Sequence, residues 1–181
     1  VEGFVVREAS RLTSSWRAEE SLADYLKRWN IVALEGIDTR ALVRHIRDKG
    51  AMRACLSTTD LDEQSLVQKA LNSPPMENRE LASVVTTKEP YDYPAVGKER
   101  FHIVCYDFGV KRNSLRELAE LGVRTTVVPS STAADDVLAL NPDGIFLSNG
   151  PGDPASMNHE VEEIKRLLQA NVPVFGICFG H

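Results

Sequence analysis

Near its end the chain carries a cysteine flanked by two glycines at equal spacing, in the phrase Gly176-Ile-Cys178-Phe-Gly180. A glycine two positions before and two positions after a nucleophile is typical of a sharp turn between a strand and a helix, with the reactive side chain at its apex. Amide groups at a helix N-terminus favour the thiolate form of such a cysteine. Because a thiolate attacks carbonyl carbon, the spacing indicates acyl-transfer chemistry at Cys178. A lone cysteine at a strand end is more often a small core residue, so this phrase alone decides little.

A second phrase could supply the groups that acyl transfer also needs. Ser148 to Pro154 reads S-N-G-P-G-D-P, which alone is a turn-rich loop. Gly150 and Gly152 would let a backbone N–H approach a substrate with no Cβ in the way. The amide after the nucleophile, that of Phe179, is placed to donate to a developing oxyanion. In a protease, losing one such donor raises the barrier by about 2.7–4 kcal/mol.

The elements around these phrases alternate regularly. We expect strands over 101–106, 124–128, 143–147 and 172–176, separated by helices over 114–121, 132–140 and 160–169. This alternation predicts an α/β fold with a doubly wound, mostly parallel sheet. Ligands bind such sheets beyond the carboxyl ends of the strands. Cys178 and the 148–154 loop both follow strands, so we expect them to share one crevice.

The amino-terminal part indicates a smaller, mixed α/β domain. We expect helices over 20–29, 38–50 and 59–71 and short strands over 31–34 and 52–56. In the second helix, Asp38 or Thr39 caps the start, and Leu42, Val43 and Ile46 form a buried stripe. Residues 86–100 contain two prolines, a glycine and several charges, which indicate a linker. We therefore expect a partial amino-terminal domain over 1–88, a linker over 89–100, and the first part of a second domain over 101–181.

Composition narrows the class of protein. A chain of 181 residues that is 43% hydrophobic and 26% charged can bury a core and is typical of soluble globular proteins. The formal net charge of −5 argues against a nucleic-acid partner. We find neither an apolar stretch of about twenty residues nor a signal-peptide pattern, and expect no membrane partner. The three cysteines lack metal-type spacing, so we expect a reducing, cytoplasmic setting.

Other polar residues are weaker candidates. His159 and Glu162 lie three apart on an expected helix, but without a third ligand a solvated face is the favoured interpretation, and we expect no metal site. Cys55 and Cys105 lie in strand patterns and are expected in the core. A further set follows the first strand of the second domain and could serve the site or cap its loop: Asp107, Lys111 and Asn113.

The two glycine-bearing phrases, S-N-G-P-G-D-P and P-V-F-G-I-C-F-G-H, together resemble the class I glutamine amidotransferases, which hydrolyse glutamine to release ammonia. The segment Gly36 to Cys55 (G-I-D-T-R-A-L-V-R-H-I-R-D-K-G-A-M-R-A-C) resembles the amino-terminal domain of the carbamoyl-phosphate synthetase small chain. Tyr106 to Leu115 (Y-D-F-G-V-K-R-N-S-L) resembles the opening of the amidotransferase domain in that family. The resemblance covers nearly the whole chain.

The resemblance implies roles for particular residues. Cys178 would be the nucleophile that forms a γ-glutamyl thioester. The backbone amides of Gly150 and Phe179 would form the oxyanion hole, and Gly152 would contact glutamine. Leucine is commoner in the family at the position of Phe179, a change that should affect only local packing because the backbone amide does the work.

The resemblance also implies partners. A large synthetase chain would use the ammonia with bicarbonate and ATP, with Mg²⁺, to make carbamoyl phosphate for arginine and pyrimidine synthesis. No cofactor is expected on this chain. Two alternatives stay open: an amidotransferase domain serving another synthetase, against which the amino-terminal half argues, and a non-catalytic module of the same fold.

The catalytic His and Glu of the family lie in an H-x-E phrase, and none occurs in these 181 residues. His181 belongs to the cysteine phrase and should not be the catalytic base. The chain begins at Val1 rather than Met, and we expect it to be a piece of a longer polypeptide that lacks both ends.

We predict that the purified 181-residue chain releases no ammonia from glutamine, because it carries no base to activate the thiol and no acid for the leaving amine. A coupled ammonia assay tests this. Steady turnover that is lost in Cys178→Ala would contradict the prediction.

Overall fold

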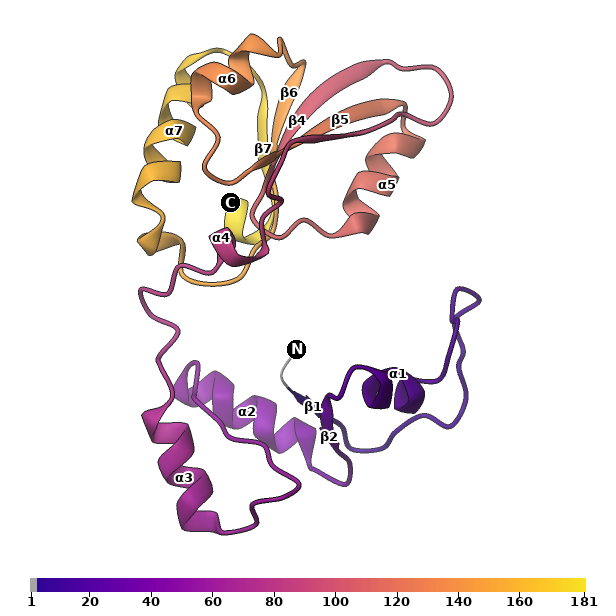
Figure 1. Ribbon diagram of the computed structural model, residues 1–181, viewed down its shortest axis with the longest axis vertical. Coiled ribbons are helices and arrows are strands. Elements are labelled where there is room, and N and C mark those ends of the chain that lie inside the picture. The colour runs from indigo at the N-terminus through magenta and orange to yellow at the C-terminus, as the bar shows by residue number, and fades with distance from the viewer. Residues whose placement is uncertain (1–2) are drawn as a thin grey trace. The chain divides into compact units, whose positions relative to one another are not determined.

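The computed structural model of the chain describes residues 3–181 (Figure 1). Its contacts divide it into two compact units, Val1–Pro75 and Met76–His181, which are described separately below. The second unit carries both glycine-bearing phrases.

The first unit consists of a two-stranded sheet and three helices. Strand β1 (Gly3–Val5) pairs in parallel with β2 (Val32–Leu34), with Phe4 opposite Ala33. The helices are α1 (Leu22–Arg28), α2 (Thr39–Lys49) and α3 (Glu63–Asn72). Each begins after a residue whose side chain accepts a backbone N–H from the first turn: Ser21, Asp38 and Asp62. Such caps satisfy amides that have no partner within the helix.

Three expectations for the first unit are wrong. The stripe on α2 is not buried: Leu42, Val43 and Ile46 are 41%, 55% and 40% exposed, because no element among the described residues of the unit covers this face of α2. Residues 52–56 form no strand, since a β-branched or apolar run becomes a strand only where a neighbour pairs with it. Cys55, expected in the core, is consequently only half-buried.

The second unit is a five-stranded sheet with the order β3-β5-β4-β6-β7. Its strands are β3 (Tyr91–Tyr93), β4 (Phe101–Asp107), β5 (Val123–Pro129), β6 (Gly144–Leu147) and β7 (Val174–Gly176). Strands β4 to β7 are parallel, and β3 pairs with β5 in the antiparallel sense. The expected α/β class with a mostly parallel sheet is confirmed.

Helices cover both faces of this sheet. They are α4 (Ala82–Val85), α5 (Arg112–Glu120), α6 (Ala134–Ala139) and α7 (Asn158–Gln169), with single 3₁₀ turns η1 (Pro154–Ser156) and η2 (Cys178–Gly180). Helix α5 lies on one face, and α6 and α7 lie on the other (Figure 1).

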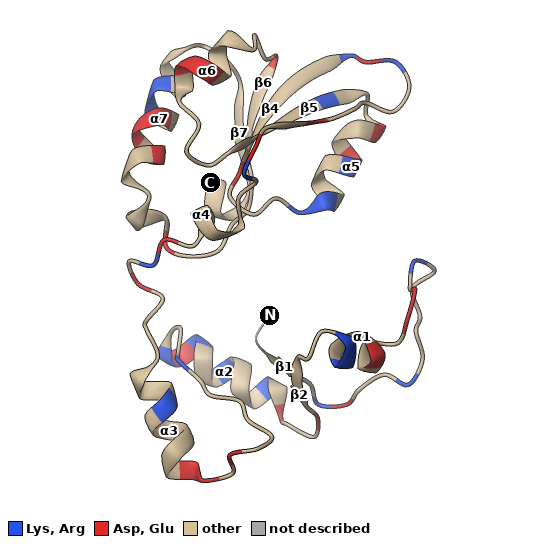
Figure 2. Ribbon diagram, in the orientation of Figure 1, with Lys and Arg blue, Asp and Glu red and all other residues tan. Residues whose placement is uncertain are grey.

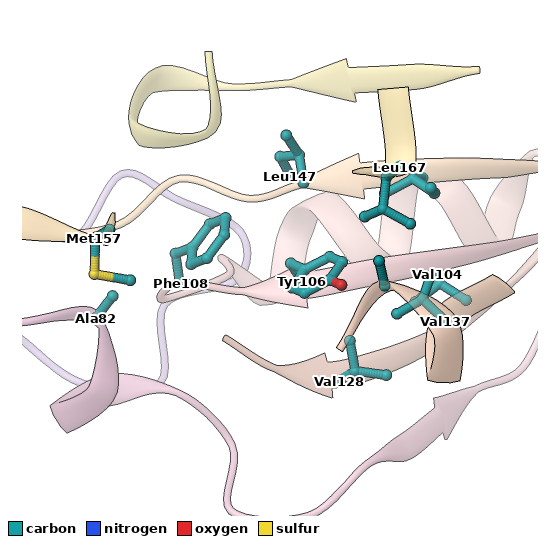
Figure 3. Close-up of a cluster of buried hydrophobic side chains, with 11 residues drawn as sticks. Ala82, Val104, Tyr106, Phe108, Val128, Val137, Leu147, Met157 and Leu167 are labelled. Carbon is teal, nitrogen blue, oxygen red and sulfur yellow. The ribbon is translucent and has the colours of Figure 1, made fainter. Parts of the chain in front are cut away.

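The alternation of side chains along β4 builds a core on each face. Val104 and Tyr106 point toward the face of α6 and α7, where they join Leu167 (Figure 3). Cys105 points to the other face, where it packs with Leu115 of α5. Because both faces are covered, the central strands read as continuous apolar runs, which is typical of parallel strands.

The order of the strands creates a switch point between β4 and β6. After β4 the chain passes through α5 to β5 on one side, whereas β6 leads through α7 to β7 on the other. The loops after β4 and β6 therefore leave adjacent strands toward opposite faces of the sheet. In open α/β sheets such a divergence opens the crevice in which ligands bind.

The expected boundary between the domains needs correction. The structure divides at Pro75 and Met76, not at residue 88, and residues 89–100 are not a free linker. Residues 91–93 form β3, which pairs along β5 from Tyr91 opposite Val127 to Tyr93 opposite Thr125. The prolines and charges that indicated a linker are here tolerated because β3 is an edge strand.

Helices α5 and α7 each carry side chains of both charges (Figure 2). In the part of the chain that the structure describes, no helix is both long and apolar enough to cross a membrane.

Leu167→Ala should destabilise the second unit by about 2–5 kcal/mol, because Leu167 is fully buried between α7 and the sheet and its truncation leaves a cavity. The neighbouring Leu168 is 61% exposed, so Leu168→Ala is a matched control with an effect well below 1 kcal/mol. Urea unfolding curves give both values. Equal effects would contradict the assigned core.

Candidate active site

Cys178 stands at the apex of a tight turn after β7. The amide of Ile177 still donates to the carbonyl of Leu147 in β6, at 3.1 Å, and the next residue leaves the sheet. Cys178 has φ +56 and opens the turn η2, in which the Gly180 amide donates to the carbonyl of Ile177 at 3.1 Å. Its side chain is exposed. The sharp turn predicted from the glycine spacing is therefore present.

The backbone of Cys178 is strained. Among the described residues, it is the one non-glycine residue other than asparagine that has a positive φ. Asparagine tolerates this region, whereas other residues with a Cβ adopt it at a cost of roughly 1–2 kcal/mol. Residues held in such conformations cluster at functional sites, where the surrounding structure fixes them.

Close packing of the backbone holds this turn in place. A Cβ on Gly180 would lie 2.3 Å from the carbonyl oxygen of Leu147, and one on Gly176 would lie 2.1 Å from that of Gly180. Both distances are far inside van der Waals contact. The two flanking glycines are therefore required because the turn folds back on itself and against the end of β6.

The second phrase follows β6 and packs against the loop that follows β4. Ser148 is fully buried, and its hydroxyl accepts the amide of Phe108 at 3.0 Å. The Asn149 side chain donates to the carbonyl of Gly109 at 2.8 Å. A Cβ on Gly150 would lie only 2.5 Å from the carbonyl oxygen of Phe108. The two loops that diverge at the switch point are thus joined by direct backbone contact.

Phe108 connects the two phrases. Its backbone contacts Gly150, and its ring lies 5.5 Å from the ring of Phe179, measured between centroids. The side chain is 2% exposed, so this bridge is part of the core. In the described part of the chain, neither the amide of Gly150 nor that of Phe179 meets an intramolecular acceptor. Both amides are therefore free to donate, and both residues contact Phe108.

Gly152 occupies a different place in the same loop. Its φ is +93, and a Cβ there would lie 2.6 Å from the carbonyl oxygen of Arg79. The contact with glutamine expected for Gly152 remains a prediction. Because Gly152 has no Cβ, the backbone of Arg79 can also approach it closely.

The structure gives several of the weaker candidates structural or surface roles. Asp107 accepts the amides of Gly109 and Val110 at 2.9 and 2.8 Å, which is loop capping. Glu162 pairs with Lys165 on the surface of α7. Within residues 3–181, no three His, Cys, Asp or Glu side chains form a metal-binding group. Cys105 is buried as expected, and burial raises the pKa of its thiol, so it stays protonated.

A cavity of about 460 Å³ lies behind the turn, between α7 and the end of the sheet. Its walls include Phe108, Met157, Phe179 and His181, but neither Cys178 nor Gly150. His181 donates its own amide to the carbonyl of Cys178 at 3.0 Å and so belongs to the turn. The exposed thiol of Cys178 therefore does not line this cavity.

Fold and site together define a class of protein. A cysteine at a strained turn after a parallel strand, next to a strand that ends in a glycine loop, is the arrangement expected of a class I glutamine amidotransferase domain. The family model "Glutamine amidotransferase class-I" matches residues 104–181, which contain all of these features.

The first half of the chain identifies the branch of this class. Residues 1–56 match the family model "Carbamoyl-phosphate synthase small chain, CPSase domain". The two matches together make the chain similar to the carbamoyl-phosphate synthase small chains over residues 1–56 and 104–181.

Curated relatives agree with this assignment. The carbamoyl phosphate synthase small chain of Syntrophotalea carbinolica is 49% identical over 100% of this chain and 51% of its own length. The proteins of the same name from Thermosynechococcus vestitus and Yersinia pestis are each 48% identical, over 100% and 99% of this chain and 51% and 50% of their own lengths. The chain spans about half the length of the curated relatives it matches.

Sequence reasoning missed two parts of the site. Phe108 gave no sign of its bridging position, because nothing in a single sequence says that it contacts Gly150 or Phe179. Residues 78–87, which carry the short helix α4, were not assigned to the site at all. The one available sign was Asn78, a residue type that favours the positive φ of 58 found there.

We predict that Gly150→Ala lowers the free energy of unfolding by about 1–3 kcal/mol, because the new Cβ must push the backbone of Phe108 away. Gly144→Ala in β6 is the matched control, since its nearest neighbour would be 3.4 Å away. Urea unfolding of the second unit measures both. A Gly150→Ala protein as stable as Gly144→Ala would show that the loop does not pack on Phe108 in solution.

Proposed function

We propose that this chain belongs to the glutamine-hydrolysing subunit of a carbamoyl-phosphate synthase and carries its nucleophile, Cys178. The observation that supports this most strongly is the strained, exposed position of Cys178, with Phe108 linking Phe179 beside it to Gly150 in the neighbouring loop. A scaffold would have no need to hold a cysteine at φ +56.

The proposed reaction begins when the Cys178 thiolate attacks the side-chain carboxamide carbon of glutamine. A C–S bond forms, and the C=O electron pair moves to oxygen. The amides of Gly150 and Phe179 stabilise that negative charge, because both are fixed donors with no competing intramolecular acceptor among the described residues. Fixed donors need not reorganise as the charge develops.

Collapse of this intermediate breaks the C–N bond, and the amine leaves as ammonia after taking up a proton. A γ-glutamyl thioester remains on Cys178. Water then attacks the thioester, which releases glutamate and returns the thiol. The net change is glutamine plus water to glutamate plus ammonia. The resemblance assigns the proton transfers to a His and a Glu in an H-x-E phrase, which these residues do not include.

Ammonia released into bulk water at neutral pH is mostly protonated and no longer nucleophilic. We therefore propose that the subunit docks on a large synthetase chain that consumes the ammonia directly with bicarbonate and ATP. The ATP and its Mg²⁺ would be bound by that partner, and this chain would work in the cytoplasm. The product, carbamoyl phosphate, would serve arginine and pyrimidine synthesis.

The main competing function is an amidotransferase domain for a different synthetase. The match of residues 1–56 to the small-chain CPSase domain disfavours it, because that domain is separate from the amidotransferase model at 104–181.

An electrophilic glutamine analogue, such as a diazo-ketone, should alkylate Cys178 in the full-length protein, and added glutamine should slow the reaction. Peptide mass spectrometry locates the adduct. Cys105 is the internal control: its thiol is buried, and burial raises its pKa, so it should stay unmodified. A full-length protein that forms no adduct at Cys178, or one that glutamine does not slow, would overturn the proposed function.

A further inference from the structure

Residues Asn78–Thr87, here called the strap, run along the edge of the sheet where β4, β5 and β6 end. The strap precedes the residues matched by the amidotransferase family model, 104–181, yet it belongs to the same compact unit. Its helix α4 lies at the carboxyl ends of the strands (Figure 1). None of its residues takes part in the proposed reaction.

The strap binds the loop after β6 at several points. The Asn78 amide donates to the Asp153 carboxylate at 2.9 Å, and the Asp153 amide donates to the carbonyl of Arg79, also at 2.9 Å. Glu80 and Gly152 then form an antiparallel bridge. The loop that carries Gly150 and Gly152 is therefore held like a short strand against the strap.

The strap also holds the loops after β4 and β5. The Thr87 amide donates to Asp107 at 2.8 Å, and the other oxygen of the same carboxylate accepts the amides of Gly109 and Val110. The hydroxyl oxygen of Thr86 accepts the amide of Ser130 at 2.9 Å. The strap thus contacts each of the loops that follow β4, β5 and β6.

The strap is itself anchored in the core. Ala82 in α4 is fully buried and lies with Met157 at the end of the hydrophobic cluster that contains Phe108 (Figure 3). The Glu80 carboxylate accepts the amide of Ser83 at 2.8 Å and so caps α4. The anchor fixes the strap at a position from which its hydrogen bonds can fix the loops.

We propose that the strap positions the loop of residues 148–154, here called the oxyanion loop. Asp153 is the positioning residue that joins this loop to the strap. The inference rests on the proposed function, since it concerns the same site. Asp153 does not touch substrate. It sets where Gly150 and Gly152 lie, and through them how well the loop fits the carboxamide of glutamine.

The chemistry of Asp153 suits this role. Its two carboxylate oxygens accept separate backbone amides, one from Asn78 in the strap and one from Ala155 at 3.0 Å. These hydrogen bonds lower the pKa of Asp153, so the group is ionised at neutral pH and accepts on both sides. An asparagine there presents only one acceptor, and its NH₂ group would face the other amide.

Asp153→Asn in the full-length protein, assembled with its large chain, tests the proposal. We expect kcat/KM for glutamine to fall at least tenfold. The rate of Cys178 alkylation by the diazo-ketone analogue should fall by a similar factor, while alkylation by iodoacetamide, which does not need the loop, should change less than twofold. Carbamoyl phosphate synthesis from added ammonia should be unchanged, because it bypasses the site.

Asp143→Asn is the matched control. Asp143 also accepts a backbone amide, that of His102 at 2.7 Å, but at the opposite end of the sheet. It should match the wild type in glutamine kinetics.

A second pair of variants changes the strap instead of the loop. Asn78 has φ +58 and bonds through its backbone amide, so Asn78→Gly should preserve activity, whereas the β-branched Asn78→Val should reduce it as Asp153→Asn does. If Asp153→Asn does not fold, this pair of variants tests the positioning role of the strap instead.

The outcomes separate the two hypotheses. Wild-type protein in which Cys178 does not react with the glutamine analogue would refute the proposed function. If wild type reacts but Asp153→Asn behaves like Asp143→Asn, or Asn78→Val behaves like Asn78→Gly, the positioning role is wrong and the proposed function stands.

Discussion

The contact between Gly150 and the carbonyl of Phe108 is the constraint on which the site depends. A Cβ at that position would come within 2.5 Å of the Phe108 oxygen, so only glycine lets the loops after β4 and β6 meet. Because these loops leave adjacent strands toward opposite faces, this contact fixes where the two loops lie relative to each other. Phe108 then passes this position on to Phe179 through ring packing at 5.5 Å. Moving either loop would break the contacts that join the Gly150 loop, through Phe108, to the turn at Cys178.

The second unit could be predicted from sequence because its determinants are local or periodic. The buried runs of β4 to β6 are continuous and apolar, which matches parallel strands covered on both faces. The turn at Cys178 was recognisable because its glycines are required by backbone crossing, and a glycine requirement is visible in a sequence. The exposure of the thiol follows from the same geometry.

The remaining features depend on pairing over long distances, which one sequence does not reveal. Residues 91–93 looked like linker because a proline follows them and charges surround them, yet β5 offers an edge on which they pair. Residues 52–56 looked like a strand, but they pair with no strand among the described residues. The stripe of α2 has correct helical spacing, but spacing alone does not supply the surface that would bury it. Asp153 read as a turn residue, and its partner lies far away along the chain.

The order in which the strap is made has a consequence for how the site is assembled. Its hydrogen bonds to Asp107, Ser130 and Asp153 close chain separations of 20, 44 and 75 residues, respectively. The strap precedes these loops in the chain, so it is synthesised before any of them. Contacts that close long separations form late, because chain entropy opposes them until the intervening strands have docked. The loop of residues 148–154 should thus reach its final shape only after β4, β5 and β6 have paired, in the last stage of folding.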